Sequence, residues 1–124
     1  QDDTQLLLAM AANETWYFTL YMAHVGNSTA DIKYGFTVPA GAAIRWACAG
    51  ANVAPGGTLD ICLSVTSSGS VDGTDGGNNE RQVVLSGVAV TGGTAGNLQF
   101  QWAQNTATAV DTKVLTNSYL EAHK

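Results

Sequence analysis

Apolar and polar side chains alternate along most of the chain, which is the pattern of strands buried on one face. In the segment Thr15–Val25, for example, Trp16 and Phe18 fall on one side, while Tyr17 and Thr19 fall on the other. No segment shows the longer period of an amphipathic helix. We therefore expect eight strands, at Thr4–Met10, Thr15–Val25, Asp31–Val38, Ala43–Ala49, Thr58–Val65, Arg81–Thr91, Asn97–Gln104 and Lys113–His123.

Segments rich in Gly, Ser, Asn and Asp separate the expected strands, and both prolines, Pro39 and Pro55, lie in such gaps. Proline lacks the N–H that a strand interior donates, so these positions support the strand boundaries. The pattern predicts a single domain over residues 1–124 that is all-β: an antiparallel two-sheet sandwich of about eight strands, of the jelly-roll type. An immunoglobulin-like sandwich is the nearest alternative, although the Cys–Trp–Cys order of that fold is absent.

The longest stretch without a strand pattern is Ser67–Glu80. Its side chains Asp72, Asp75 and Asn78 carry the hard oxygen ligands that calcium prefers, so they form a weak candidate calcium site. Their spacing does not match that of a calcium-binding EF-hand loop, and solvated turns are built from the same residue types. A solvated loop without metal is therefore the favoured interpretation.

The composition excludes some function classes. Charged residues make up 12% of the 124-residue chain, about half the usual share, and the net charge is −5. The five basic residues are scattered, so no basic stripe exists that could follow a phosphate backbone, and nucleic-acid binding is disfavoured. No apolar run is long enough to cross a bilayer, so we expect no membrane contact.

Residues for catalysis are few and show no recognisable arrangement. The only histidines, His24 and His123, lie near the ends of expected strands. The sequence contains no nucleophile-elbow motif and no pair of carboxylates that a strand pattern would place together. We therefore expect neither an enzyme nor a cofactor.

The two cysteines, Cys48 and Cys62, are too few for a thiolate zinc site. In the strand alternation Cys48 shares a face with Ile44 and Trp46, whereas Cys62 shares a face with Asp60. A disulfide needs two Cβ atoms on the same face of neighbouring strands. Two free cysteines are therefore favoured over a disulfide.

The strand Asn97–Gln104 has one apolar face and one neutral face, which carries Gln99, Gln101 and Ala103. Amides both donate and accept hydrogen bonds, and they avoid the repulsion of like charges across a symmetry axis, so this face suits contact with copies of the same chain. The strand Arg81–Thr91 is apolar on both faces, with Val84 and Val88 on one of them. This indicates that one face is covered within the domain and that the other face packs against something else. These five side chains are the predicted subunit interface. The alternative is an ordinary solvent face beside a well-covered strand.

Three tryptophans could form a platform for sugars, which would make the chain a carbohydrate-binding β-sandwich module. Each of them shares its strand face with aliphatic side chains, so packing in the core is the favoured role. The tryptophans are Trp16, Trp46 and Trp102.

Several stretches together resemble a group of tailed-bacteriophage virion surface proteins. The opening strand pair "QDDTQLLLAMAANETWYFTLYM" and the segments "DIKYGFTVPAGA", "GNLQFQWAQNTA" and "TNSYLEAHK" follow one another as in that group. The most specific pieces are "AANETW" and "LQFQWAQNTA", and the resemblance spans essentially the whole chain.

This resemblance implies the jelly-roll head of a virion protein, commonly a homotrimer, without a cofactor or catalysis. The expected function is an external capsid decoration, or cement, protein, whose partners are its own copies and the major capsid protein or another virion component. A tail- or head-fibre domain that contacts the host surface, including its glycans, is the alternative within the group. Either role places the chain on the outside of the virion, where a preceding N-terminal part is expected to anchor it.

Overall fold

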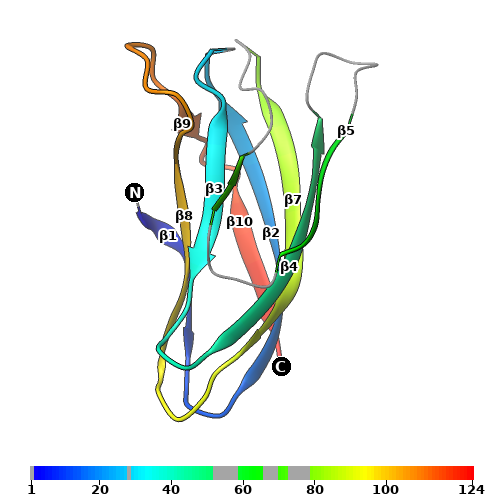
Figure 1. The fold of residues 1–124 in the computed structure, drawn as a ribbon, viewed down its shortest axis with the longest axis vertical. Helices are drawn as coiled ribbons and strands as arrows, with labels where there is room; N and C mark the ends of the chain where they lie inside the picture. Colours follow the sequence, from blue (N-terminus) through cyan, green and yellow to red (C-terminus); the bar gives the residue numbers. More distant parts are fainter. Residues whose placement is uncertain (1, 28, 52–58, 66–69, 73–78) are drawn as a thin grey trace.

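The computed structural model describes residues 2–27, 29–51, 59–65, 70–72 and 79–124 (Figure 1). No helix is found in this described part, and so none that could span a membrane. Its strands are β1 (Asp2–Met10), β2 (Thr15–Val25), β3 (Ile32–Thr37), β4 (Ala43–Ala51), β5 (Leu59–Val65), β6 (Ser70–Asp72), β7 (Arg81–Val90), β8 (Gly96–Gln104), β9 (Lys113–Val114) and β10 (Tyr119–His123).

The strands form two antiparallel sheets that pack face to face (Figure 1). The smaller sheet has the order β1–β8–β3–β6, and the larger has the order β10–β2–β7–β4–β5, with β9 also paired to β2. Among the first eight strands, β1 pairs with β8, β2 with β7, β3 with β6 and β4 with β5, as in one long hairpin wound around the sandwich. This wrapping is the jelly-roll connectivity, so the predicted fold class is confirmed.

Two expected segments differ from the structure. The predicted strand Lys113–His123 is split into β9 and β10 by a turn, in which the N–H of Ser118 donates to the carbonyl of Leu115 at 3.0 Å. The segment Ser67–Glu80, predicted as a loop, contains the short strand β6, which pairs with β3. Three residues are too few to show an alternation, so β6 leaves no signal in the sequence.

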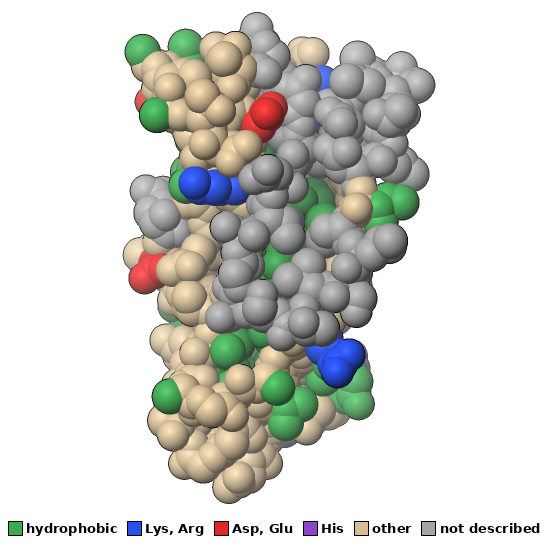
Figure 2. Space-filling model, in the orientation of Figure 1, with side chains coloured by type: hydrophobic (Ala, Val, Ile, Leu, Met, Phe, Trp, Pro, Cys, Tyr) green, Lys and Arg blue, Asp and Glu red, His purple; other side chains and the backbone are tan. Residues whose placement is uncertain are grey.

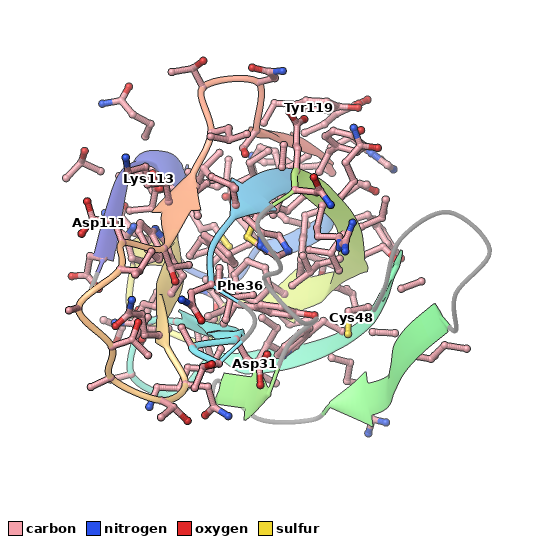
Figure 3. All side chains as sticks on the ribbon, turned by 90° about the horizontal axis from the view of Figure 1, so that it is seen from above. Asp31, Phe36, Cys48, Asp111, Lys113 and Tyr119 are labelled. Atoms are coloured by element: carbon pink, nitrogen blue, oxygen red, sulfur yellow. The ribbon has the colours of Figure 1, made fainter. Side chains whose placement is uncertain are left out.

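Phe36 lies at the centre of the core, between the two layers (Figure 3). Its ring centroid lies 5.0 Å from that of Phe18, 5.3 Å from that of Trp46 and 5.6 Å from that of Phe100. Phe18 and Trp46 belong to the larger sheet, whereas Phe36 and Phe100 belong to the smaller one. The aromatic cluster therefore holds the two layers together through edge-on and tilted ring contacts.

Cys48 is disulfide-bonded, which overturns the expectation of two free cysteines. The only other cysteine in the sequence is Cys62, and it is the direct cross-strand partner of Cys48. Directly opposite residues of an antiparallel pair project to the same face. The expectation failed because it took the face that Cys62 shares with Asp60 to be turned away from Cys48, whereas it is Ile61, on the opposite face of that strand, that is 61% exposed.

The "AANETW" turn joins β1 to β2 and is fastened to the end of the chain. One carboxylate oxygen of Glu14 accepts hydrogen bonds from the N–H of Ala11 at 2.9 Å and from the indole N–H of Trp16 at 2.8 Å. The other oxygen binds Lys124, whose ammonium also lies 5.0 Å from the centroid of the Trp16 ring. The hydrogen bond from Lys124, followed by those from Trp16 and Ala11, lowers the pKa of Glu14 to about 2. This part of the motif therefore has a structural role.

Asn13, in the same turn, adopts a left-handed backbone conformation with φ of 60°, and its N–H donates to the carbonyl of Gly92 at 2.8 Å. Alanine tolerates this conformation poorly, whereas glycine adopts it freely. We expect Asn13→Ala to lower the free energy of unfolding by about 1 kcal/mol. We expect Asn13→Gly to leave it nearly unchanged. Denaturant unfolding of the two variants tests this, and equal stabilities would contradict it.

Candidate functional site

The five residues of the predicted subunit interface lie on two opposite outer faces of the sandwich. Val84 and Val88 are on the outer side of β7, in the larger sheet. Gln99, Gln101 and Ala103 are on the outer side of β8, in the smaller sheet, because the residues that alternate with the two glutamines on β8 are buried. The structure therefore does not bring the five together, and each face has to be considered separately.

The amides of β8 bind the first strand of their own chain. The side-chain N–H groups of Gln99 donate to the carbonyl of Asp3, and those of Gln101 donate to the carboxylate of Asp2 at 2.6 Å. The carboxylate of Asp3 accepts the N–H groups of Gln5 and Leu6, at 2.9 Å and 3.0 Å, where the pairing of β1 with β8 shifts register. The amides thus satisfy an irregular stretch of β1. Figure 2 shows one side of the molecule, on which the coloured charged side chains are few and lie apart from one another.

A third amide organises the loop after β8. The side chain of Gln104 donates to the carbonyl of Val110 at 2.6 Å and accepts the N–H of Thr108 at 3.1 Å. The "LQFQWAQNTA" segment therefore carries amides with local structural partners. A hollow of about 310 Å³ lies beside this loop, and it is lined by Trp102, Ala103, Gln104, Thr108, Asp111 and Thr112.

The outer face of the larger sheet carries an apolar row that crosses all five strands of its main path. Cross-strand pairing aligns Tyr119 of β10 with Tyr21 of β2, then with Val84 of β7, Ala49 of β4 and Ile61 of β5. Tyr119 is 52% exposed, Val84 is 40% exposed and Ile61 is 61% exposed. Exposed apolar side chains that form one contiguous patch mark a contact site, whereas single ones are ordinary.

A second row on this face runs parallel to the first. It aligns His123 of β10 with Tyr17 of β2, Val88 of β7 and Arg45 of β4. Tyr17 is 52% exposed, and Val90, beyond this row on β7, is 41% exposed. We call the outer side of β10, β2, β7, β4 and β5 the outer apolar face.

The aromatic rings of this face are stacked on one another. Tyr21 and Tyr119 have ring centroids 5.5 Å apart with planes at 18°, and Tyr17 and His123 have centroids 5.6 Å apart with planes at 21°. Rings that stack across neighbouring strands stand upright on the sheet, so they turn their edges to solvent. A sugar platform requires open ring faces, so this arrangement favours contact with a protein surface.

The tryptophans pack as core residues, as the sequence predicts. Trp46 is 2% exposed, and Trp16 and Trp102 are partly buried against the core cluster. Trp46 therefore offers no ring face to a sugar, and the Trp16 ring already has the Lys124 ammonium over it.

The remaining candidate groups do not converge. His24 is buried in the core side of β2, whereas His123 is exposed near the end of β10. Within the residues that the structure describes, no group of three His, Cys, Asp or Glu side chains could hold a metal ion. Of the candidate calcium ligands, Asp75 and Asn78 lie outside the described residues, and Asp72 ends β6, paired with β3.

The described part of the chain thus offers an outer apolar face on one side and an amide-lined face, bound to its own first strand, on the other. The first can bury area against another protein, whereas the second already has its hydrogen-bond partners. No family model, curated protein or solved structure shows a significant match to this chain.

Proposed function

We propose that this chain is a structural subunit that associates with copies of itself on the outside of a tailed-bacteriophage particle, as a capsid decoration protein. The observation that supports self-association is the outer apolar face, where Tyr119, Val84 and Ile61 are exposed in one row. The phage setting, and the expected homotrimer, rest on the resemblance of the sequence.

The physical basis of the assembly is the burial of apolar surface between neutral faces. Each square ångström of apolar area removed from water contributes about 25 cal/mol, so a sheet face of several hundred square ångströms can hold subunits together. The low share of charged residues, 12%, leaves little repulsion between like surfaces. Such a contact depends little on salt, because few ion pairs take part in it.

The first test is the solution mass of the 124-residue chain, measured by analytical ultracentrifugation over a range of concentrations. We expect a mass well above the 12.8 kDa of one chain. A mass of 12.8 kDa at every concentration would contradict the proposal.

A substitution tests whether the outer apolar face carries the contact. Val84→Asp places a carboxylate in the middle of the apolar row, where association would desolvate it, so we expect the dissociation constant to rise about 100-fold or more. Thr37→Asp is the matched control, because Thr37 is an exposed strand residue on the opposite sheet. Equal effects of the two substitutions would place the contact elsewhere.

Labelling tests the phage setting. An antibody against this chain should bind over the whole capsid surface of intact particles in electron micrographs. Labelling confined to the tail or to fibre tips would favour the fibre alternative, and absence of labelling from purified particles would contradict the virion role.

A further inference from the structure

We propose that two copies of this chain pack with their outer apolar faces together, related by a two-fold axis that runs parallel to the strands and passes over β7. The inference rests on the proposed self-association and adds to it the symmetry of the contact. It follows from the way in which large, small and uncharged side chains are distributed over the five strands.

The outer apolar face has a bulky side and a small side. The bulky side lies on β10 and β2, where Tyr119 stacks on Tyr21, and His123 on Tyr17. The small side lies on β4. Every second residue of this strand points outward, and apart from Arg45 the described ones are alanines. These alanines are Ala43, Ala47 and Ala49. Between the two sides runs β7, whose outer residues are Gln82, Val84, Ser86, Val88 and Val90.

The proposed axis places the bulky side of one copy on the small side of the other. Because β2 and β4 are the two neighbours of β7, a rotation about an axis along β7 exchanges them. Tyr21 and Ala49 both pair with Val84, so Tyr21 of one copy faces Ala49 of the second copy. Tyr17 and Arg45 both pair with Val88, so Arg45 of one copy faces Tyr17 of the other, and its guanidinium can donate a hydrogen bond to the Tyr17 hydroxyl.

An axis in the other in-plane direction gives a poorer fit. A two-fold axis across the strands would bring β2 onto β2 and β4 onto β4, in opposite directions. With that axis at the level of Ser86, the bulky Tyr21 of one copy would meet the bulky Tyr17 of the other, and Ala49 would meet Arg45. Close packing requires large side chains to face small ones, so the axis along β7 is favoured.

The outer residues of β7, which would face the same residues of the second copy across the axis, carry no charge. With the axis along β7, Val84, Ser86, Val88 and Val90 of one copy each face the same residue of the other. Like charges in such positions would repel across the axis, whereas valines bury area and two hydroxyls can donate to each other. Among the side chains that the structure describes on this face, the charged ones, Glu121 and Arg45, lie on other strands, away from the axis.

The area is sufficient for a specific contact of moderate strength. Five strands about 4.8 Å apart, followed for about 3.3 Å per residue from Thr15 to Tyr21, outline roughly 500 Å² per copy. The two copies together would bury about 1,000 Å², which is near the lower limit for a specific interface. The contact gives an even number of copies: two by itself, or six when it is combined with the three-fold assembly that the resemblance implies.

Cross-linking at the axis is the first test. Ser86→Cys places one thiol per copy next to its symmetry mate, and a short bismaleimide should convert most of the protein into covalent dimers and no larger covalent species. Thr37→Cys, on the opposite sheet, is the control and should remain largely monomeric under the same treatment. If the protein self-associates but Ser86→Cys cross-links no better than Thr37→Cys, the two-fold contact is refuted while the proposed function stands.

A size exchange tests the pairing of bulky and small residues. We expect Ala49→Tyr and Tyr21→Ala each to raise the dissociation constant of the dimer about 10-fold, and the double variant to return it to within about 3-fold of the original. Circular dichroism of each variant would confirm that the sandwich is intact. Failure of the double variant to recover would overturn the inference, as would a particle of three copies. A protein that is monomeric at all concentrations would overturn the proposed self-association as well.

Discussion

Gly87→Ala is expected to lower the free energy of unfolding by about 3 kcal/mol, at the upper end of the range for overpacked cores. A Cβ atom at Gly87 would lie 2.2 Å from the carbonyl oxygen of Arg45 and 2.8 Å from the Cβ of Trp46. Gly87 is paired with Trp46 on one side and with Phe18 on the other, in the middle of the larger sheet. The added methyl group therefore meets backbone, which can yield only if β4 moves away from β7.

Denaturant unfolding measures this effect directly. Gly93→Ala is the matched control, because a Cβ atom at Gly93 would meet no atom within 4 Å, and we expect a change within about 0.5 kcal/mol. A Gly87→Ala protein as stable as the original would show that β4 and β7 lie further apart than the structure has them.

Acidification from pH 7 to pH 5 is expected to lower the free energy of unfolding by about 2 kcal/mol through His24 alone. Burial, followed by the nearby positive charge of Arg81, lowers the pKa of His24 from 6.5 to about 4. The unfolded chain therefore binds a proton below about pH 6.5 that the folded chain does not bind until about pH 4. The stability from neutral His24 is present in full above pH 6.5 and is lost as the pH falls to 4, in total about 3 kcal/mol.

A comparison of the two histidines tests this account. His24→Gln removes the titrating group, so the unfolding free energy of this variant should change little between pH 7 and pH 5, whatever its value at pH 7. His123→Gln replaces an exposed histidine and should keep the full pH dependence of the original protein. Parallel pH profiles for all three proteins would show that another group causes any acid instability.

The strand pattern predicted most of the fold, because burial on one face imposes a period of two on each strand. The expected strand Thr15–Val25 coincides with β2, and the expected Asn97–Gln104 lies within β8. The connectivity could be predicted as a jelly roll because about eight strands with uneven loops have few ways to close two sheets. The order within each sheet comes from pairings between distant segments, which the alternation does not contain.

The errors arose where an apolar residue faces solvent. In the alternation Cys62 shares the face of Asp60, which turns Cys62 away from Cys48 and leaves the other face of the strand, with Ile61, for the core. In the structure Ile61 belongs to the outer apolar face. The alternation along the strand was therefore predicted correctly, but the wrong face was taken as the buried one. Periodicity separates two faces of a strand, but it identifies the buried face only when the other face is polar.

The candidate interface was predictable only in part. The apolar character of both faces of Arg81–Thr91 correctly drew attention to Val84 and Val88, which lie on the outer apolar face. The glutamines of β8 drew attention for their lack of charge, but Gln99 and Gln101 bind the irregular start of β1. The exposed tyrosines of β2 and β10 were not predicted to form a contact surface. They stack on one another because β2 pairs with β10, and this pairing cannot be read from the sequence of either strand alone.

The pairing of β1 with β8 also determines the order of events during synthesis on the ribosome. β1 leaves the ribosome before the other strands described here, and the described strand with which it pairs is β8, which is translated more than eighty residues later. Until then Leu6 and Met10, buried in the finished sandwich, have no partner strand to cover them. The pairing of β1 with β8 can form only after β8 has emerged, so the apolar side chains of β1 stay exposed for most of the synthesis of this domain, which favours aggregation.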